Sequence, residues 1–160
     1  MSDSSGDIVA FWERVRIELP HLPEAVPEAW AFGATPEMAD ELLTLVLQGT
    51  KTATASSLWE CEEDGDPVPE AGSLSIVLDG AGIPRAVIET TDVKIVPFNE
   101  VDETHAYEEG EGDRTLAYWR EVHEHYWRSY SPRFEPDMPA ICEKFRLLYP
   151  TSDTNSGQLA

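Results

Sequence analysis

The chain has 160 residues, of which 31 are Asp or Glu and 11 are Lys or Arg, so its formal net charge is -20. A surface this negative repels a phosphate backbone and an anionic membrane, which excludes extended nonspecific binding to either. The apolar fraction of 41% is sufficient for a domain with its own hydrophobic core.

The ends of the chain differ in composition from its middle. Residues 1–6 and 150–160 are poor in apolar side chains, and we predict disordered tails there. Residues 7–149 are predicted to form a single domain, with N-terminal helices over residues 7–34 packed on it. Because the sequence has no apolar run of the roughly 18 residues that span a membrane and no signal-peptide pattern, we expect a soluble cytoplasmic protein.

The first third of the chain has helical periodicity. Apolar residues recur every three or four positions over residues 8–19, which predicts a helix that ends before the following proline. A second helix is predicted over residues 23–32. Thr35 is placed to cap a third helix that begins with Pro36, and Gly49 is placed to end it.

The middle and the end of the chain have the pattern of strands. Residues 73–78 and 85–96 alternate or are β-branched, and the turn sequence at 79–82 between them predicts a β-hairpin. Asp113 is predicted to cap a long helix, and residues 140–149 are predicted to form a closing strand. These elements predict an α+β fold around a small β-barrel or strongly curved sheet flanked by helices.

Acidic residues gather in two stretches, 60–70 and 100–113, which contain neither Lys nor Arg. We predict that both are solvated loops, because their carboxylates lack the convergent spacing of a metal site. His123 and His125 are two residues apart on a predicted helix and diverge by about 200°, which argues against a shared metal. We therefore predict neither a metal nor a cofactor.

Lys51 is the only Lys or Arg between Arg16 and Arg85, and it lies in a run of small hydroxyl side chains. Such a run surrounds one cation with hydrogen-bonding groups, although a solvated lysine in an ordinary loop has the same appearance. In a regular strand Lys51 and Thr54 would point to opposite faces. Joint chemistry of these two residues therefore needs a turn or a bulge.

Residues 49–54, Gly-Thr-Lys-Thr-Ala-Thr, resemble the G-x-K-x-x-T signature of the ASCH domain, a small β-barrel related to the PUA fold. Three further blocks in the expected order strengthen the resemblance, at residues 39–43, 109–120 and 137–145. The resemblance extends over about residues 30–149 and is greatest to the longer bacterial ASCH proteins with an added N-terminal helical segment. It implies a PUA-like barrel.

The resemblance also implies a function. ASCH domains were proposed to bind RNA, one short bacterial member hydrolyses N4-acetylcytidine, and another has been described as a ribonuclease. In the amidohydrolase pattern a lysine and a threonine of the signature act with a glutamate. These positions match Lys51, Thr54 and Glu109, with Glu108 and Glu111 as alternatives for the glutamate.

The chemistry of amide hydrolysis assigns roles to these residues. A neutral Lys51 would activate Thr54 or a water, whereas a charged Lys51 would stabilise an oxyanion. Neighbouring carboxylates are expected to raise the proton affinity of Glu109, which suits a general acid. The substrate pocket around Lys51 is predicted to be completed by six more residues: Gly49, Thr50, Thr52, Ser56, Trp59 and Arg120.

Two functions follow as hypotheses. The first is a metal-independent hydrolase that acts on a small modified nucleoside such as N4-acetylcytidine. The alternative is an RNA-binding module or ribonuclease that uses the same cleft together with a cluster of arginines. These arginines either attract a phosphate or neutralise neighbouring acids such as Glu121 and Glu124. The cluster consists of Arg114, Arg120, Arg128 and Arg133.

Overall fold

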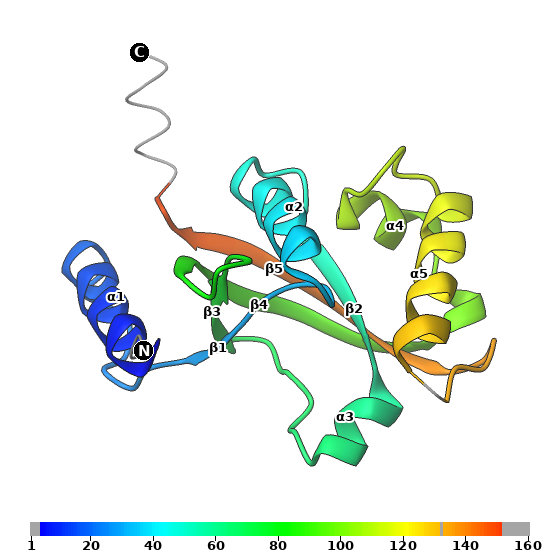
Figure 1. Cartoon of the computed structure of the whole chain (residues 1–160), viewed down its shortest axis with the longest axis horizontal. Coiled ribbons are helices and arrows are strands. Elements are labelled where there is room, and N and C mark those ends of the chain that lie inside the picture. The colour runs from blue at the N-terminus through cyan, green and yellow to red at the C-terminus, as the bar shows by residue number, and fades with distance from the viewer. Residues whose placement is uncertain (1–3, 132, 152–160) are drawn as a thin grey trace. The chain divides into compact units, whose positions relative to one another are not determined.

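The computed structural model describes residues 4–131 and 133–151 (Figure 1). In this part of the chain the helices are α1 (Ser4–Glu18), α2 (Pro36–Leu47), α3 (Leu58–Asp64), α4 (Glu103–Glu109) and α5 (Leu116–Tyr130), with one 3-10 turn, η1 (Phe98–Glu100). The strands are β1 (Glu28–Trp30), β2 (Ala53–Ser57), β3 (Leu74–Leu78), β4 (Pro84–Pro97) and β5 (Pro139–Tyr149).

The five strands are hydrogen bonded in the order β1-β3-β4-β5-β2. Strand β1 runs parallel to β3, whereas the β3–β4 and β2–β5 pairs are antiparallel. A mixed sheet of this kind, with helices before and between its strands along the chain, is an α+β fold, which confirms the predicted fold class. Within the described residues, no helix has both the length and the apolar character needed to cross a membrane.

The chain divides into two compact units, and each is described by itself. In the described residues the first unit contains 4–47, 74–89 and 147–151, and the second contains 48–73 and 90–146. Strands β4 and β5 contribute to both units. The prediction of one domain over residues 7–149 stays a prediction.

The first unit has its core between α1 and the β3–β4 hairpin. Phe11, Trp12 and Val15 of α1 are buried with Ile76 of β3 and Val87 of β4. The helix begins at Ser4, so the tail predicted over residues 1–6 is wrong from that residue onward. Residues 1–3 and 152–160 of the predicted tails lie outside the described residues.

Several local predictions are confirmed in the first unit. The backbone N–H of Met38 donates to Thr35 Oγ1 at 3.2 Å, which caps α2 as expected. The predicted hairpin is present, and Asp79 Oδ1 orders its turn by accepting from the N–H groups of Ala81 (2.8 Å) and Ile83 (3.0 Å). The turn is further held because Gly80 N donates to Asp40 Oδ1 at 2.8 Å.

The helix predicted over residues 23–32 is wrong. Residues 28–30 instead form β1, in which Glu28 pairs with Ser75 and Trp30 pairs with Val77. A helix over this segment would have placed Pro27 in its interior, where the missing N–H group and the ring are unfavourable. Pairing with β3 satisfies the backbone without that penalty.

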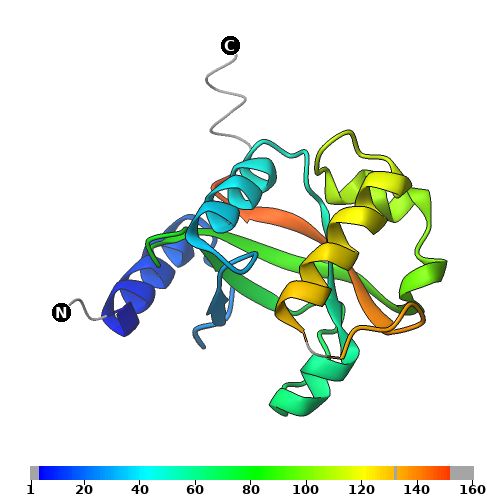
Figure 2. The ribbon, with the colours of Figure 1, turned by 45° about the vertical axis from the view of Figure 1, so that its right-hand side comes forward.

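The second unit has its core between α5 and the β2–β5 pair. Trp119 and Trp127 of α5 are buried with Phe98, and the Phe98 and Trp119 rings stack at 5.5 Å. Figures 1 and 2 show α4 and α5 side by side. The cap of α5 is Thr115, whose Oγ1 accepts from Tyr118 N at 3.1 Å, rather than the predicted Asp113.

The two acidic stretches of the second unit are helical in part, so the prediction of loops is wrong for those parts. Residues 58–64 form α3, and residues 103–109 form α4. Asp102 caps α4 because its Oδ1 accepts from His105 N at 3.0 Å. Both stretches were predicted to be solvated, yet α4 buries the side chain of Glu109.

Candidate active site around Lys51

Lys51 lies in a short segment between α2 and β2, and its side chain is only 1% exposed. Gly49 allows the chain to turn after α2 because it adopts a φ of +83°. The segment is then fixed on both sides, since Thr52 N donates to Glu108 O at 2.8 Å and Thr52 O accepts from Phe145 N at 3.0 Å. Lys51 is therefore buried against the end of α4.

Gly110 permits this close approach. It ends α4 with a φ of +74°, and a Cβ atom at this position would lie 2.6 Å from Thr50 O. Only glycine adopts this conformation readily and also lacks the Cβ atom that would collide with Thr50. The α4 terminus and the residue before Lys51 therefore meet backbone to backbone.

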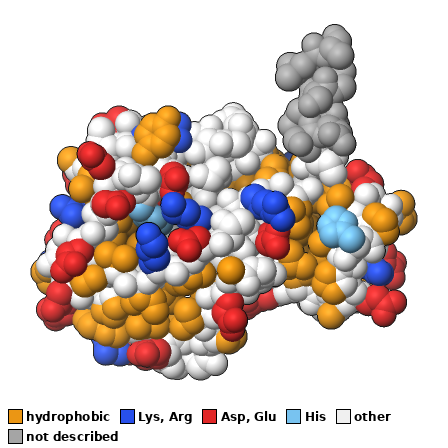
Figure 3. All heavy atoms as spheres, turned by 180° about the vertical axis from the view of Figure 1, so that it is seen from behind, with side chains coloured by type: hydrophobic (Ala, Val, Ile, Leu, Met, Phe, Trp, Pro, Cys, Tyr) orange, Lys and Arg blue, Asp and Glu red, His pale blue; other side chains and the backbone are white. Residues whose placement is uncertain are grey.

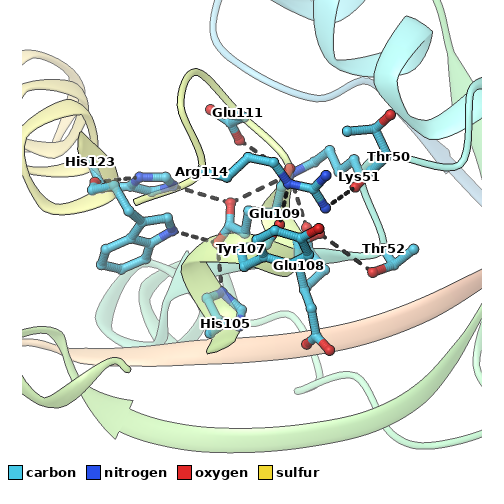
Figure 4. A network of polar contacts seen from close by, with 12 residues as sticks. Thr50, Lys51, Thr52, His105, Tyr107, Glu108, Glu109, Glu111, Arg114 and His123 are labelled. Carbon is cyan, nitrogen blue, oxygen red and sulfur yellow. Dashed lines mark hydrogen bonds and ion pairs between the residues drawn. The ribbon is translucent and has the colours of Figure 1, made fainter. Parts of the chain in front are cut away.

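The Lys51 ammonium lies between two carboxylates (Figure 4). Its Nζ atom is 3.4 Å from Glu109 Oε1 and 3.2 Å from Glu111 Oε2, and it also donates to Ala53 O at 2.9 Å. A buried ammonium requires such partners because removing a charge from water is costly. Glu109 is 1% exposed, whereas Glu111 is 20% exposed.

Glu109 is the centre of the cluster. Its Oε2 accepts from His105 Nε2 at 2.6 Å and from Trp119 Nε1 at 2.8 Å, and its Oε1 lies 3.3 Å from His123 Nε2 in addition to Lys51. With four nitrogen donors around it, this carboxyl group is held in its ionised form.

The pKa of Glu109 follows from these contacts. Burial raises the pKa, but the charges of Lys51 and His123 and the hydrogen bond from His105 outweigh burial and hold it well below its usual value of 4.5. The expectation of a raised proton affinity is therefore wrong. Glu109 is a fixed anion and does not suit the role of general acid.

His123 is the second basic residue that faces Glu109 in the cluster. Its Nδ1 lies 2.9 Å from the Trp119 carbonyl oxygen and its Nε2 faces Glu109, so both ring nitrogens meet acceptors. Burial lowers the pKa of His123, but the Glu109 carboxylate overcomes this effect and raises the pKa above 6.5. Its ring also stacks on Trp119 with a centroid distance of 4.2 Å.

Three residues of the cluster could hold a metal ion. Donor atoms of Glu109, Glu111 and His123 lie within 4.8 Å of one another, and two carboxylates with an imidazole suit a transition metal. Lys51 Nζ, however, lies at hydrogen-bonding or ion-pairing distance from both carboxylates and supplies the positive charge there. The expected absence of a metal stays a prediction.

The structure does not bring Thr54 together with Lys51. Ala53 and Ala55 face the side of β2 on which α4 and α5 lie, and strand alternation turns Thr54 to the other side. Thr54 is paired directly with Glu143 of β5. The chain turns before β2 begins, so the Thr54 side chain does not return to the side of Lys51. A mechanism in which Thr54 is the nucleophile beside Lys51 therefore has no geometric support.

The three candidate glutamates, Glu108, Glu109 and Glu111, differ in their partners. Glu108 Oε1 pairs with Lys144 Nζ at 3.4 Å, whereas Glu109 and Glu111 both face Lys51. The sequence predicted both as candidates, but it favoured a polar pair at a helix start for His105 and did not place His123 in the site. The spacing of His105 and Glu109, four residues apart, was the one available signal for a shared helix face.

The remaining predicted pocket residues have other contacts. Thr50 O accepts from Arg114 Nη2 at 3.3 Å, so Thr50 borders the cluster through its backbone. Arg120 Nη2 instead donates to the carbonyl groups of Asn99 and Val101, each at 3.0 Å. Ser56 is exposed on the same strand face as Thr54, and Trp59 packs against the core of the second unit. The contacts of Arg120 and Trp59 do not involve the Lys51 cluster.

The arginine cluster is engaged within the protein. Arg128 Nε pairs with Glu124 Oε2 at 2.7 Å, Arg133 pairs with Glu63, and Arg120 donates to backbone carbonyls. Figure 3 shows Lys and Arg side chains scattered among Asp and Glu on the face it displays. These contacts favour the predicted neutralisation of acidic neighbours over a phosphate-binding track.

Comparison with known protein families identifies the family of this chain. A sequence profile of the ASCH domain matches residues 28–149. The chain belongs to the ASCH domain family. The search of curated proteins found no match.

Solved structures agree with this assignment. A protein from Enterococcus faecalis V583 is 35% identical, with a TM-score of 0.82 over 96% of this chain and 94% of that one. An ASCH domain from Lactobacillus crispatus JV V101 is 28% identical, with a TM-score of 0.77 over 89% of this chain and 94% of that one. The fold thus has the PUA-like architecture that the family resemblance implied.

Proposed function

We propose that this ASCH domain hydrolyses the amide bond of a small uncharged nucleoside such as N4-acetylcytidine. The observation that supports the proposal is the position of Lys51 Nζ between a buried carboxylate, Glu109, and a partly exposed one, Glu111. Such a pair of groups offers a fixed positive charge and an accessible base side by side.

The two carboxylates have different roles in this proposal. Glu109 is surrounded by donors and holds Lys51 in place, so it is a positioning residue. Glu111 is 20% exposed and can meet water, so it is the general base. Lys51 keeps its charge between them and stabilises the oxyanion of the tetrahedral intermediate.

The reaction then proceeds in two steps. Glu111 accepts a proton from a water molecule while the water oxygen forms a bond to the amide carbon, and negative charge develops on the carbonyl oxygen near Lys51. The carbon–nitrogen bond then breaks, and the proton passes from Glu111 to the departing amine. The products are a carboxylic acid and the amino form of the base.

Charge favours a small neutral substrate over RNA. The net charge of -20 opposes a long phosphate backbone, and three of the clustered arginines are engaged by Glu124, Glu63 and backbone carbonyls. A single nucleoside needs no basic track. RNA binding or cleavage remains the alternative that the experiment below distinguishes.

The test compares Glu111→Gln with Glu108→Gln in N4-acetylcytidine hydrolysis. Removing the base should lower kcat by about 10²- to 10⁴-fold with little change in melting temperature. Glu108 is the matched control because it pairs with Lys144 at the surface, and its variant should keep near-normal turnover. Equal activity of both variants would remove Glu111 from the mechanism.

The alternative has its own signature. If the wild-type protein cleaves no acylated nucleoside but binds single-stranded RNA with an affinity that falls steeply with salt, the RNA function replaces the hydrolase.

A further inference from the structure

Arg114 has an unusual backbone and side-chain setting beside the Lys51 cluster. Among the described residues it is the one non-glycine residue with a left-handed backbone, at a φ of +65°. Non-glycine residues adopt this conformation at a cost and are often found at functional sites. The reason for it here lies in the contacts of the side chain.

The Arg114 guanidinium is stacked and oriented. Its Cζ atom lies 3.7 Å from the centroid of the Tyr107 ring, Nε donates to Tyr107 O at 2.9 Å, and Nη2 donates to Thr50 O at 3.3 Å. These two bonds engage two of the five N–H groups that a guanidinium carries. Arginine planes held in this way accept a flat aromatic group on their other face.

The stack borders an open groove of about 390 Å³, which is large enough for a nucleoside. The groove is lined by one cation, Arg114, and one anion, Glu103, together with Tyr107, Leu116, Thr104 and Thr115. Opposite charges balance, and the hydroxyl groups can donate and accept. This lining suits an uncharged polar aromatic ligand rather than a phosphate.

Arg114 links the groove that it lines to the candidate catalytic pair. Arg114 N donates to Glu111 O at 3.0 Å, so the stacked arginine and the proposed base belong to one tight turn. Figure 4 shows Tyr107 and Arg114 next to Lys51 and Glu111. A flat group on the guanidinium would therefore lie close to the Lys51–Glu111 pair.

We propose that the Arg114–Tyr107 stack is the platform that binds the nucleobase of the substrate. The inference rests on the proposed function for the identity of the ligand and adds the element that recognises it. The base lies on the guanidinium face that Tyr107 does not cover, and its exocyclic amide points toward Glu111.

The test measures binding of cytidine, which has no amide to cleave, by titration calorimetry. Arg114→Lys keeps the charge but loses the plane, and Tyr107→Ala removes the support, so each should weaken binding by about 5-fold or more. Arg128→Lys is the matched control, because Arg128 also stacks on an aromatic ring, at 4.8 Å from the Phe134 centroid. Tyr107→Phe should bind as the wild type does.

The outcomes separate this inference from the proposed function. Unchanged cytidine affinity in both Arg114→Lys and Tyr107→Ala, with melting temperatures near that of the wild type, would overturn the platform even if amide hydrolysis were found. An equal loss in Arg128→Lys would also overturn it. A selective loss of cytidine binding in a protein that hydrolyses no amide would keep the platform and reject the hydrolase.

Discussion

Two buried glutamates of the second unit, Glu109 on α4 and Glu143 on β5, are in opposite electrostatic surroundings. Glu109 is 1% exposed and meets Lys51 and His123, and its pKa is held well below 4.5. Glu143 is 9% exposed, and the partner of its Oε2 is the Thr90 hydroxyl at 2.6 Å. Burial raises the pKa of Glu143, and the Thr90 hydrogen bond only partly opposes that rise.

The comparison shows that burial does not decide the charge of a carboxyl group. Both side chains lose contact with water, which favours the neutral form. Only Glu109 has cations within ion-pairing distance, and these reverse the effect. The ionised carboxylate is therefore Glu109, which contacts Lys51. Glu143, whose carboxyl group favours its proton, is on the other face of the β2–β5 pair.

The family signature is divided between these two surroundings. Lys51 contacts Glu109, whereas Thr54 is paired in register with Glu143. Lys51 precedes β2 and Thr54 lies within it, and the alternation of the strand directs the Thr54 side chain away from the side of Lys51. Their surroundings are correspondingly different: Lys51 is paired with the carboxylates of the candidate site, and Thr54 belongs to the sheet face of Glu143.

The largest expected effect comes from Lys51→Ala, which removes the cation from the first of these surroundings. Glu109 would keep its burial but lose a charge partner, so the free energy of unfolding should fall by about 3 to 5 kcal/mol in urea denaturation at neutral pH. The exposed Lys94 is the control, and Lys94→Ala should change it by less than about 0.5 kcal/mol.

A double variant sharpens this result. Glu109→Gln removes the charge that Lys51→Ala leaves uncompensated, so the combined loss should be smaller than the sum of the single losses. Additive losses would show that the two residues are not coupled, which contradicts the ion pair as the source of stability. The sequence alone left open a solvated lysine in an ordinary loop, and the 1% exposure of Lys51 contradicts that alternative.

A metal ion should take the place of the ammonium once Lys51 is removed. In Lys51→Ala, the donors of Glu109, Glu111 and His123 lie close enough together to contract around Zn²⁺. At about 100 times its dissociation constant the ion would restore about 2.7 kcal/mol, seen as a higher melting temperature.

The wild-type protein is the control for metal binding, because Lys51 already supplies the cation there. Its melting temperature should not respond to Zn²⁺, and neither should that of the Lys51→Ala/Glu109→Gln double variant. An equal rise in all three proteins would mean that Zn²⁺ binds elsewhere on the acidic surface.

Local patterns predicted much of the fold because their physical causes are local. The Thr35 cap, the hairpin turn at 79–82 and the final strand depend on residues close in sequence. Strand β1 could not be predicted in this way. It has three residues, and its pairing with β3 joins positions 47 apart, such as Glu28 and Ser75.

The charge state of Glu109 could not be predicted from the sequence for a similar reason. Its sequence neighbours are acidic, and they indicate a raised proton affinity. The cations that lower its pKa come from other elements, namely Lys51 before β2 and His123 on α5. The alternation that separates Lys51 from Thr54, by contrast, was visible in the sequence as a condition on joint chemistry.

The smallest expected effect concerns Glu143 and has the opposite sign to that of Glu109. The folded-state pKa of Glu143 is raised above 4.5, so the folded protein binds this proton more strongly than the unfolded chain does. Stability from this group therefore falls as the pH rises from about 4.5 through the raised pKa. For Glu109, whose pKa is lowered, the stabilising contribution is present above pH 4.5 and is lost as the pH falls.

Glu143→Gln tests this difference because the amide resembles the neutral acid and can donate to Thr90. It should unfold like the wild type near pH 4.5 and be more stable by about 1 kcal/mol at neutral pH, where the wild-type carboxyl group must either ionise without a cation or hold its proton. Glu109→Gln should be less stable than the wild type at neutral pH. The measurement is urea unfolding of the three proteins from pH 4.5 to 8. Destabilisation by Glu143→Gln across that whole range would mean that the Thr90 hydrogen bond outweighs burial and keeps Glu143 ionised, and the two glutamates would then be alike.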